Sequence, residues 1–167
     1  MIEYADSTVD DIVDANLPVD MPKEEWDLDS LTAKVVQYCV LLQGVVTPEA
    51  VTKIYEAGGK EAIREFLKEE CRGAYEKKRV MIEELEPGLM DEVESFLVLT
   101  QTDRMWKEHL QAIKFIQQAV GLRGYAQRDP LTEYKLEGFK LFKEMRDQIR
   151  RNVIYSVYQF QPKQPPQ

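Results

Sequence analysis

Apolar residues recur every three or four positions along most of this chain, which is the period of an amphipathic α-helix. The pattern predicts three long helices, over residues 60–86, 89–120 and 130–160. Strand-like alternation is nearly absent, so we predict an all-α fold. The apolar stripes consist of Ala62, Ile63, Phe66, Leu67, Ala74, Tyr75 and Ile82 in the first helix, Phe96, Leu99, Trp106, Leu110, Ile113 and Val120 in the second, and Phe139, Phe142, Met145, Ile149, Val153 and Phe160 in the third.

Two short helices are predicted before these long ones. An acidic segment with a capping-box-like spacing begins at Ser7 and stops at a proline-containing break over residues 16–22. A second helix is capped by Asp27 or Asp29 and ends at Gly44. These elements are short because glycine and proline interrupt the pattern.

A third short helix is predicted from Thr47-Pro48-Glu49 to Gly58-Gly59. Its first residues combine an N-cap, a proline at the first helical position and an acid in the first turn. The long helix that follows is interrupted at Pro87-Gly88. The first half of the chain is therefore predicted to be a compact group of helices.

The last two long stripes suit an antiparallel helical hairpin, with the stripes forming most of its seam. Gly121 and Gly124 supply the conformational freedom to end one helix and turn, and Asp129 and Pro130 cap and start the next. Gly138 inside the second arm predicts close packing there, since glycine costs about 1 kcal/mol of helix propensity relative to alanine. The tip loop comprises Leu122, Arg123, Gly124, Tyr125, Ala126, Gln127 and Arg128.

A tyrosine between two arginines is unusual for a plain connector, so the tip predicts a contact surface. Trp106 is interpreted as a packing anchor, and the neighbouring His109 as a polar rim residue.

The two cysteines, Cys39 and Cys71, lie on predicted helices without a CxxC spacing, and we favour two buried, reduced thiols over a disulfide. His109 and the cysteines have no recognisable metal-site spacing, so no metal is predicted.

The net charge of −8 is unevenly distributed: residues 1–100 carry a large excess of Asp and Glu, whereas residues 101–167 are net basic. The basic half can face an anionic surface, a partner protein or the acidic half itself. The cluster Arg146, Arg150 and Arg151 raises nucleic-acid binding as a weaker reading, but acidic residues are interleaved with it and the sequence pI is 4.8. No nucleic acid is therefore predicted as a partner.

Several functional classes lack their signatures in this sequence. The longest apolar runs are too short for a membrane span, and the N-terminus has no signal- or transit-peptide pattern, so membrane contact is predicted to be peripheral. No phosphate-binding loop, serine elbow or HExxH motif occurs. We therefore predict no catalytic residue in this chain.

Several segments at characteristic separations strongly resemble the SecA family, the motor subunits of the preprotein translocase. They are DRMWKEHL (103–110), LRGYAQRDP (122–130) and EYK (133–135), and the similarity extends back through residues 87–90 and Trp26-Asp27 to the start. Segments QQAVG (117–121) and RRNVIY (150–155) look most like cyanobacterial and chloroplast members.

The resemblance implies a domain organisation: residues 1–20 would be the end of a scaffold helix, 21–87 a helical wing domain, 88–160 the two-helix finger of the helical scaffold domain, and 161–167 a disordered tail. It also implies that the finger tip enters the cytoplasmic funnel of a SecY-type channel, with Tyr125 contacting the translocating polypeptide. ATP and Mg would bind in the remaining motor domains, with no cofactor in this segment.

The implied partners are a preprotein, the channel and the other SecA domains. The implied location is the chloroplast stroma and thylakoid surface, or alternatively the bacterial cytoplasm and peripheral inner membrane. An autonomous all-helical protein-binding adaptor is the alternative function.

Overall fold

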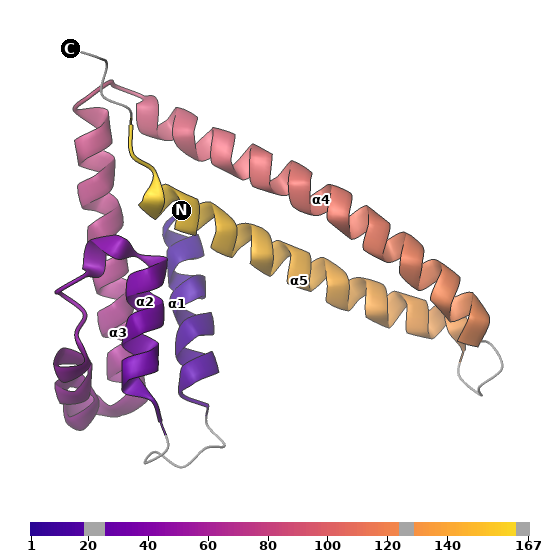
Figure 1. The fold of residues 1–167 in the computed structure, drawn as a ribbon, viewed down its shortest axis with the longest axis horizontal. Helices are drawn as coiled ribbons and strands as arrows, with labels where there is room; N and C mark the ends of the chain where they lie inside the picture. Colours follow the sequence, from indigo (N-terminus) through magenta and orange to yellow (C-terminus); the bar gives the residue numbers. More distant parts are fainter. Residues whose placement is uncertain (19–25, 124–128, 163–167) are drawn as a thin grey trace. The chain divides into compact units, whose positions relative to one another are not determined.

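A computed structural model describes residues 1–18, 26–123 and 129–162, and every regular element in these ranges is helical (Figure 1). The predicted all-α fold is confirmed. By compactness the chain divides into two units, residues 1–94 with 154–167 and residues 95–153. The elements are α1 (Ile2–Asn16), α2 (Leu28–Tyr38), the 3-10 helix η2 (Val40–Leu42), α3 (Pro48–Glu83), α4 (Leu89–Arg123) and α5 (Pro130–Gln159).

Local capping signals account for several helix starts. Asp27 caps α2, because its carboxylate accepts a hydrogen bond of 2.8 Å from the Ser30 amide. Thr47 caps α3 through a 3.3 Å bond from the Ala50 amide, with Pro48 as the first helical residue. Both predicted starts are confirmed, since a side-chain oxygen here satisfies an amide that has no partner within the helix.

Four predicted boundaries were wrong. Helix α1 begins at Ile2, so Ser7 lies inside it rather than at its start. Its buried residues Ala5, Val9 and Val13 follow a four-residue spacing, and this stripe extends helix formation ahead of the capping-like signal.

The other three errors concern helix ends. Helix α3 ends at Glu83, three residues before the predicted end at residue 86. Helix α2 ends at Tyr38, and the η2 turn intervenes before Gly44, whose φ is +83°. Helix α4 continues past Gly121 to Arg123. A glycine only permits a helix end, so the position of the end depends on where packing stops.

Gly59 divides α3 into the two helices predicted from the sequence. Its φ of 72° and ψ of −160° are non-helical and kink the element. A side chain at such a φ is strained, so glycine suits the position. The kink separates a short first helix from the longer segment that packs against α1.

The unit made of residues 1–94 and 154–167 has a continuous apolar core. Helices α1, α2 and α3 contribute aliphatic side chains, and the end of α5 contributes apolar and aromatic ones. The large side chains with almost no exposed surface include Val9, Val13, Leu17, Leu31, Val35, Ile63, Leu67, Ile82, Ile154 and Tyr158.

A ladder of ion pairs runs beside this core between α1 and α3. Acidic residues on α1 and basic residues on α3 both recur every four positions, which places each set along one helix face. The ladder consists of Lys60–Asp14 at 2.7 Å, Arg64–Asp14 and Arg64–Asp10 at 2.8 Å, Lys68–Asp10 at 2.9 Å and Arg72–Asp6 at 2.6 Å. The polar edge of the α1–α3 contact is therefore closed by paired charges.

Candidate functional site: the two-helix hairpin

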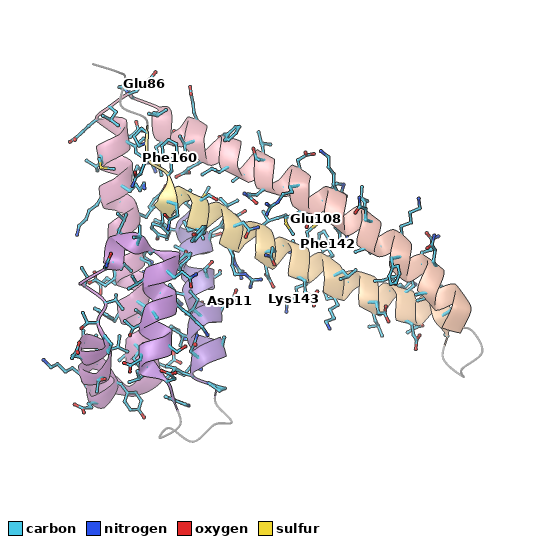
Figure 2. The ribbon with its side chains drawn as sticks, in the orientation of Figure 1. Asp11, Glu86, Glu108, Phe142, Lys143 and Phe160 are labelled. Carbon is cyan, nitrogen blue, oxygen red and sulfur yellow. The ribbon has the colours of Figure 1, made fainter. Side chains whose placement is uncertain are left out.

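Helices α4 and α5 lie side by side in the unit formed by residues 95–153, and Figure 2 labels Glu108 and Phe142 on facing stretches of the two. The ring of His109 lies 5.9 Å from the ring of Phe142 in an edge-on arrangement. Farther along the two helices from their connecting loop, the Asn152 amide nitrogen lies 3.9 Å from the Met105 sulfur. Residue numbers fall along α4 as they rise along the facing part of α5, so the predicted antiparallel hairpin is confirmed.

The two helices end and begin on either side of the tip loop. Asp129 caps α5 by accepting bonds of 3.3 Å from the amides of Leu131 and Thr132 and one of 2.7 Å from the Thr132 hydroxyl. The hydrogen bond from the Thr132 side chain lowers the pKa of Asp129, as do those from the two amides. Pro130 is the first helical residue, so the predicted start of the second arm is confirmed.

The tip loop itself lies largely outside the described residues. Leu122 and Arg123 belong to the last turn of α4. The remaining predicted tip residues are Gly124, Tyr125, Ala126, Gln127 and Arg128, and they lie outside the described ranges. The contact role of Tyr125 therefore stays a prediction.

The seam of the hairpin differs from the predicted stripe on α4. Phe96, Leu99, Trp106 and Leu110 were expected in the seam, but they are exposed, by 66%, 68%, 45% and 51%. Val120 and Met145 are buried as predicted, and Ile116, which lies outside the predicted stripe, is buried too. On α5, the stripe residues Phe139 and Phe142 are exposed instead, by 70% and 39%. The four exposed residues lie on one side of α4, because their spacings of three, seven and four residues correspond to nearly whole turns.

Close packing at Gly138 is confirmed. A Cβ atom added there would lie 3.5 Å from the Ile113 Cδ1 atom, which is ordinary van der Waals contact. The arms thus approach each other closely enough to touch across this point, with room for one methyl group.

An exposed aromatic and aliphatic face is the main surface feature of the hairpin. The His109 ring lies 5.7 Å from the Trp106 ring on its own helix and 5.9 Å from Phe142 on the other, so it joins exposed rings of both arms. On α5 the exposed apolar residues are Leu131, Leu136, Phe139 and Phe142. Exposed apolar residues in such number mark a contact surface more often than a free one.

The described hairpin offers little for catalysis. A cavity of about 220 Å³ lies between the arms, lined in part by Glu108, His109 and Glu144. Within residues 1–18, 26–123 and 129–162, no group of three or more His, Cys, Asp or Glu side chains is placed to hold a metal ion. None of the helices in the same ranges is both long enough and apolar enough to cross a membrane.

The family model of the SecA wing and scaffold domain matches residues 1–161. The chain belongs to this SecA family. The predicted resemblance is confirmed over nearly the whole sequence.

Similar curated proteins include the chloroplastic protein translocase subunit SecA of Pisum sativum, 59% identical over 97% of this chain. The chloroplastic SecA of Spinacia oleracea is also 59% identical over 97% of the chain. The SecA of Synechococcus elongatus is 48% identical over the same share. The predicted likeness to chloroplast and cyanobacterial SecA is therefore confirmed.

The chain spans 16%, 15% and 17% of the lengths of these three relatives. It therefore corresponds to about a sixth of a SecA subunit, the part that contains the wing and scaffold. The domain boundaries predicted at residues 20, 87 and 160 stay predictions.

Two features of the site were not predicted from the sequence. Periodicity identified the apolar face of α4 but not its exposure, because a stripe does not reveal what covers it. The contact between the His109 and Trp106 rings was not predicted either, although their spacing of three residues on one helix was a usable signal that the rings are neighbours.

Proposed function

We propose that this chain forms the wing and two-helix finger of a SecA-type motor that moves preproteins across a membrane. The observation that carries the proposal is the SecA wing and scaffold family match over residues 1–161. The hairpin supports it, because α4 and α5 are long helices that suit the two arms of the predicted finger.

In this proposal Tyr125 contacts the translocating polypeptide while the tip faces a SecY-type channel. A tyrosine suits this role because it combines a large apolar ring with a hydroxyl, and so contacts many sequences weakly. Arg123 and Arg128 flank it and orient the tip against the channel or the neighbouring scaffold.

The remaining domains of the longer SecA subunit would bind and hydrolyse ATP with Mg. This chain would contribute no catalytic residue and would transmit movement to the preprotein. The exposed apolar face of α4 and α5 supports this division, since it leaves a surface for other parts of the motor to cover.

We place the protein in the chloroplast stroma and at the thylakoid surface, because the chloroplastic relatives are 59% identical against 48% for the cyanobacterial one. The bacterial cytoplasm with a peripheral inner-membrane location is the alternative.

The test is Tyr125→Ala in the full-length motor, with preprotein translocation into membrane vesicles as the readout. Loss of one aromatic contact of about 0.5–1.5 kcal/mol predicts a translocation rate lower by up to about tenfold. The matched control is Tyr155→Ala, which removes an exposed tyrosine from the last turns of α5. Equal rates for wild type, Tyr125→Ala and Tyr155→Ala, with normal folding, would overturn the tip role.

An autonomous helical adaptor is the second candidate, and the exposed hairpin face also supports it. The two proposals differ in what the isolated chain does. An adaptor captures one partner protein selectively without motor domains or channel, whereas a motor segment requires them. Pull-down with the 167-residue chain separates the two.

A further inference from the structure

A second cavity lies in the unit formed by residues 1–94 and 154–167, where the η2 turn and the residues after it pack against α3. This η2–α3 cavity measures about 220 Å³, and most of its wall is apolar. The apolar lining residues are Leu41, Leu42, Val45, Ala74 and Met81. Leu42 and Ala74 are buried, whereas the other three are exposed. The cavity therefore combines a buried apolar part with an apolar rim that solvent reaches.

Three charged residues of α3 also line the η2–α3 cavity, namely Glu70, Lys77 and Lys78. In the part of the chain that the structure describes, none of the three forms an ion pair. Two positive charges and one negative charge leave an excess of one positive charge. Glu70 precedes Lys78 by eight residues, which is about 12 Å along a helix. The excess is therefore located at the end of the cavity that holds the two lysines.

Lys78 is a buried ammonium without a counter-ion. Its side chain belongs to a residue that is only 4% exposed, and its nitrogen donates a hydrogen bond of 2.7 Å to the Tyr158 carbonyl oxygen. This is the one hydrogen bond of Lys78 within the described ranges, although an ammonium has three N–H donors. Burial lowers the pKa of Lys78, because a charge removed from water is costly unless it is paired. An anion in the cavity would supply the missing partner.

The acceptor of the Lys78 bond is itself held in place. The Tyr158 hydroxyl donates a hydrogen bond of 2.8 Å to the Cys71 carbonyl oxygen, and its ring packs edge-on against Tyr38 with centroids 5.4 Å apart. Cys71 and Cys39 are free and buried, as predicted from the sequence. Lys78 is therefore fixed by a buried network before any ligand binds, which reduces the entropy that binding would cost.

An apolar wall with one excess positive charge at one end fits a ligand with an apolar body and a single negative charge. An aliphatic monocarboxylate has this composition, since its chain buries apolar surface and its head accepts charge-assisted hydrogen bonds. The volume lies between a cavity of about 150 Å³ that holds benzene and the pockets of about 300 Å³ or more that hold drug-sized ligands. A chain of medium length is therefore expected.

We propose that the η2–α3 cavity binds an aliphatic monocarboxylate, with its carboxylate at Lys78 and Lys77 and its chain against the apolar wall. The site lies outside the hairpin and does not depend on the proposed translocation role.

The experiment titrates the folded 167-residue chain with octanoate, octanol, octylammonium and acetate by isothermal calorimetry. Octanoate should bind saturably at one site. Octanol and octylammonium should bind at least about tenfold more weakly, because neither offers an anion to the lysines. Acetate should bind weakly as well, because it lacks the chain. Equal affinities for octanoate and octylammonium, or no saturable binding of octanoate, would overturn the proposal.

Methyl NMR on the same chain tests where octanoate binds. The methyl signals of Ala74 and Met81 should shift with the calorimetric affinity. Those of Ala112 and Met105, which line the cavity between the hairpin arms, should stay unchanged and serve as the internal control. Shifts confined to Ala112 and Met105 would contradict the assigned site.

The variant Lys78→Met tests the role of the buried ammonium, because methionine keeps an unbranched apolar side chain and removes the charge. Octanoate affinity should fall at least about tenfold, while octanol affinity should change little. Lys53→Met, at an exposed lysine of α3 outside the cavity, is the matched control and should bind octanoate like the wild type. Wild-type affinity in folded Lys78→Met would overturn the proposal. If circular dichroism shows that Lys78→Met does not fold, the wild-type ligand selectivity and methyl shifts decide it.

Discussion

In residues 1–94 and 154–167, core side chains such as Ile63, Leu67 and Tyr158 have almost no exposed surface, whereas in residues 95–153 Phe96, Leu99 and Phe139 are each about two-thirds exposed or more. Both units are helical and both carry regular apolar stripes. The difference is in what the stripes face. Three helices and the end of a fourth enclose the stripes of the first unit, but two helices alone can cover only the sides that face each other.

The comparison shows that an amphipathic helix does not by itself produce a core. A pair of helices buries one narrow seam, and the remaining apolar surface needs a further partner. The first unit therefore contains most of its stabilising contacts, while the hairpin leaves a large apolar surface exposed. Substitutions that are chemically alike should have different effects in the two units.

The largest difference is expected for Leu67→Ala against Leu99→Ala. Leu67 is fully buried, so its truncation should lower the free energy of unfolding by about 2–5 kcal/mol, whereas Leu99→Ala should change it by less than about 0.5 kcal/mol. Urea titrations followed by circular dichroism measure both. Similar losses for the two variants would contradict the comparison.

The ion-pair ladder predicts a smaller, pH-dependent effect confined to the first unit. Burial raises the pKa of Asp10, but hydrogen bonds from Lys68 and Arg64 outweigh it, so the net pKa lies below 3.8. The pKa of Asp14 is also lowered, mainly by its hydrogen bond from Arg64. Because both carboxyls have lower pKa values in the folded chain, their contribution is present above the unfolded pKa and is lost as pH falls below about 4.

Removing these ion pairs should therefore make the free energy of unfolding less dependent on pH in the acid range. Replacing both Asp10 and Asp14 with Asn should cost about 1 kcal/mol at pH 7, since these carboxylates are partly exposed, and much less at pH 3. Urea titrations at the two pH values measure the change. Asp103→Asn in the exposed pair with Lys107 is the control, and its effect should be close to zero.

Glycine substitutions should distinguish free space from close contact. Gly138→Ala places a methyl group at an ordinary distance from Ile113 and gains helix propensity, so it should stabilise the hairpin by up to about 1 kcal/mol. Gly58→Ala should instead destabilise the chain, because the new Cβ would lie 2.7 Å from the Ala62 Cβ. Thermal unfolding by circular dichroism should give shifts of opposite sign.

The smallest effect is expected on the exposed face of the hairpin. Phe96→Ser and Phe139→Ser should each change the free energy of unfolding of the isolated chain by less than about 0.5 kcal/mol, because both rings are already in solvent. In a full-length SecA subunit the same variants should have larger effects on stability if that face is covered. A large loss in the isolated chain would show that these rings belong to an internal core.

The sequence predicts local features of this fold well. Asp27, Thr47 and Asp129 begin helices because one side chain satisfies amides two or three residues away, and nothing distant is required. The start of α1 was predicted wrongly because its buried stripe, which depends on packing with other helices, extends ahead of Ser7. Within the hairpin, only features that depend on residues close together in the sequence, such as the Asp129 cap, were predictable.

Long-range features were beyond pattern analysis. The hydrogen bond from the Tyr158 hydroxyl to the Cys71 carbonyl oxygen depends on how α3 and the end of α5 pack, and no spacing in the sequence encodes it. The exposure of Trp106 depends likewise on how many helices surround α4. Tyr125 was identified from its residue type and family, and its role awaits the translocation experiment.

The α1–α3 ladder attracts the two helices without fixing their alignment. Its acidic residues Asp6, Asp10 and Asp14 and its basic partners share a period of four, so a shift of α1 by one turn would still set acids opposite bases. The same shift would move the small Ala5 into a site filled by the larger Val9. Register along this contact is therefore decided by side-chain size in the core, and the charges favour several alignments almost equally.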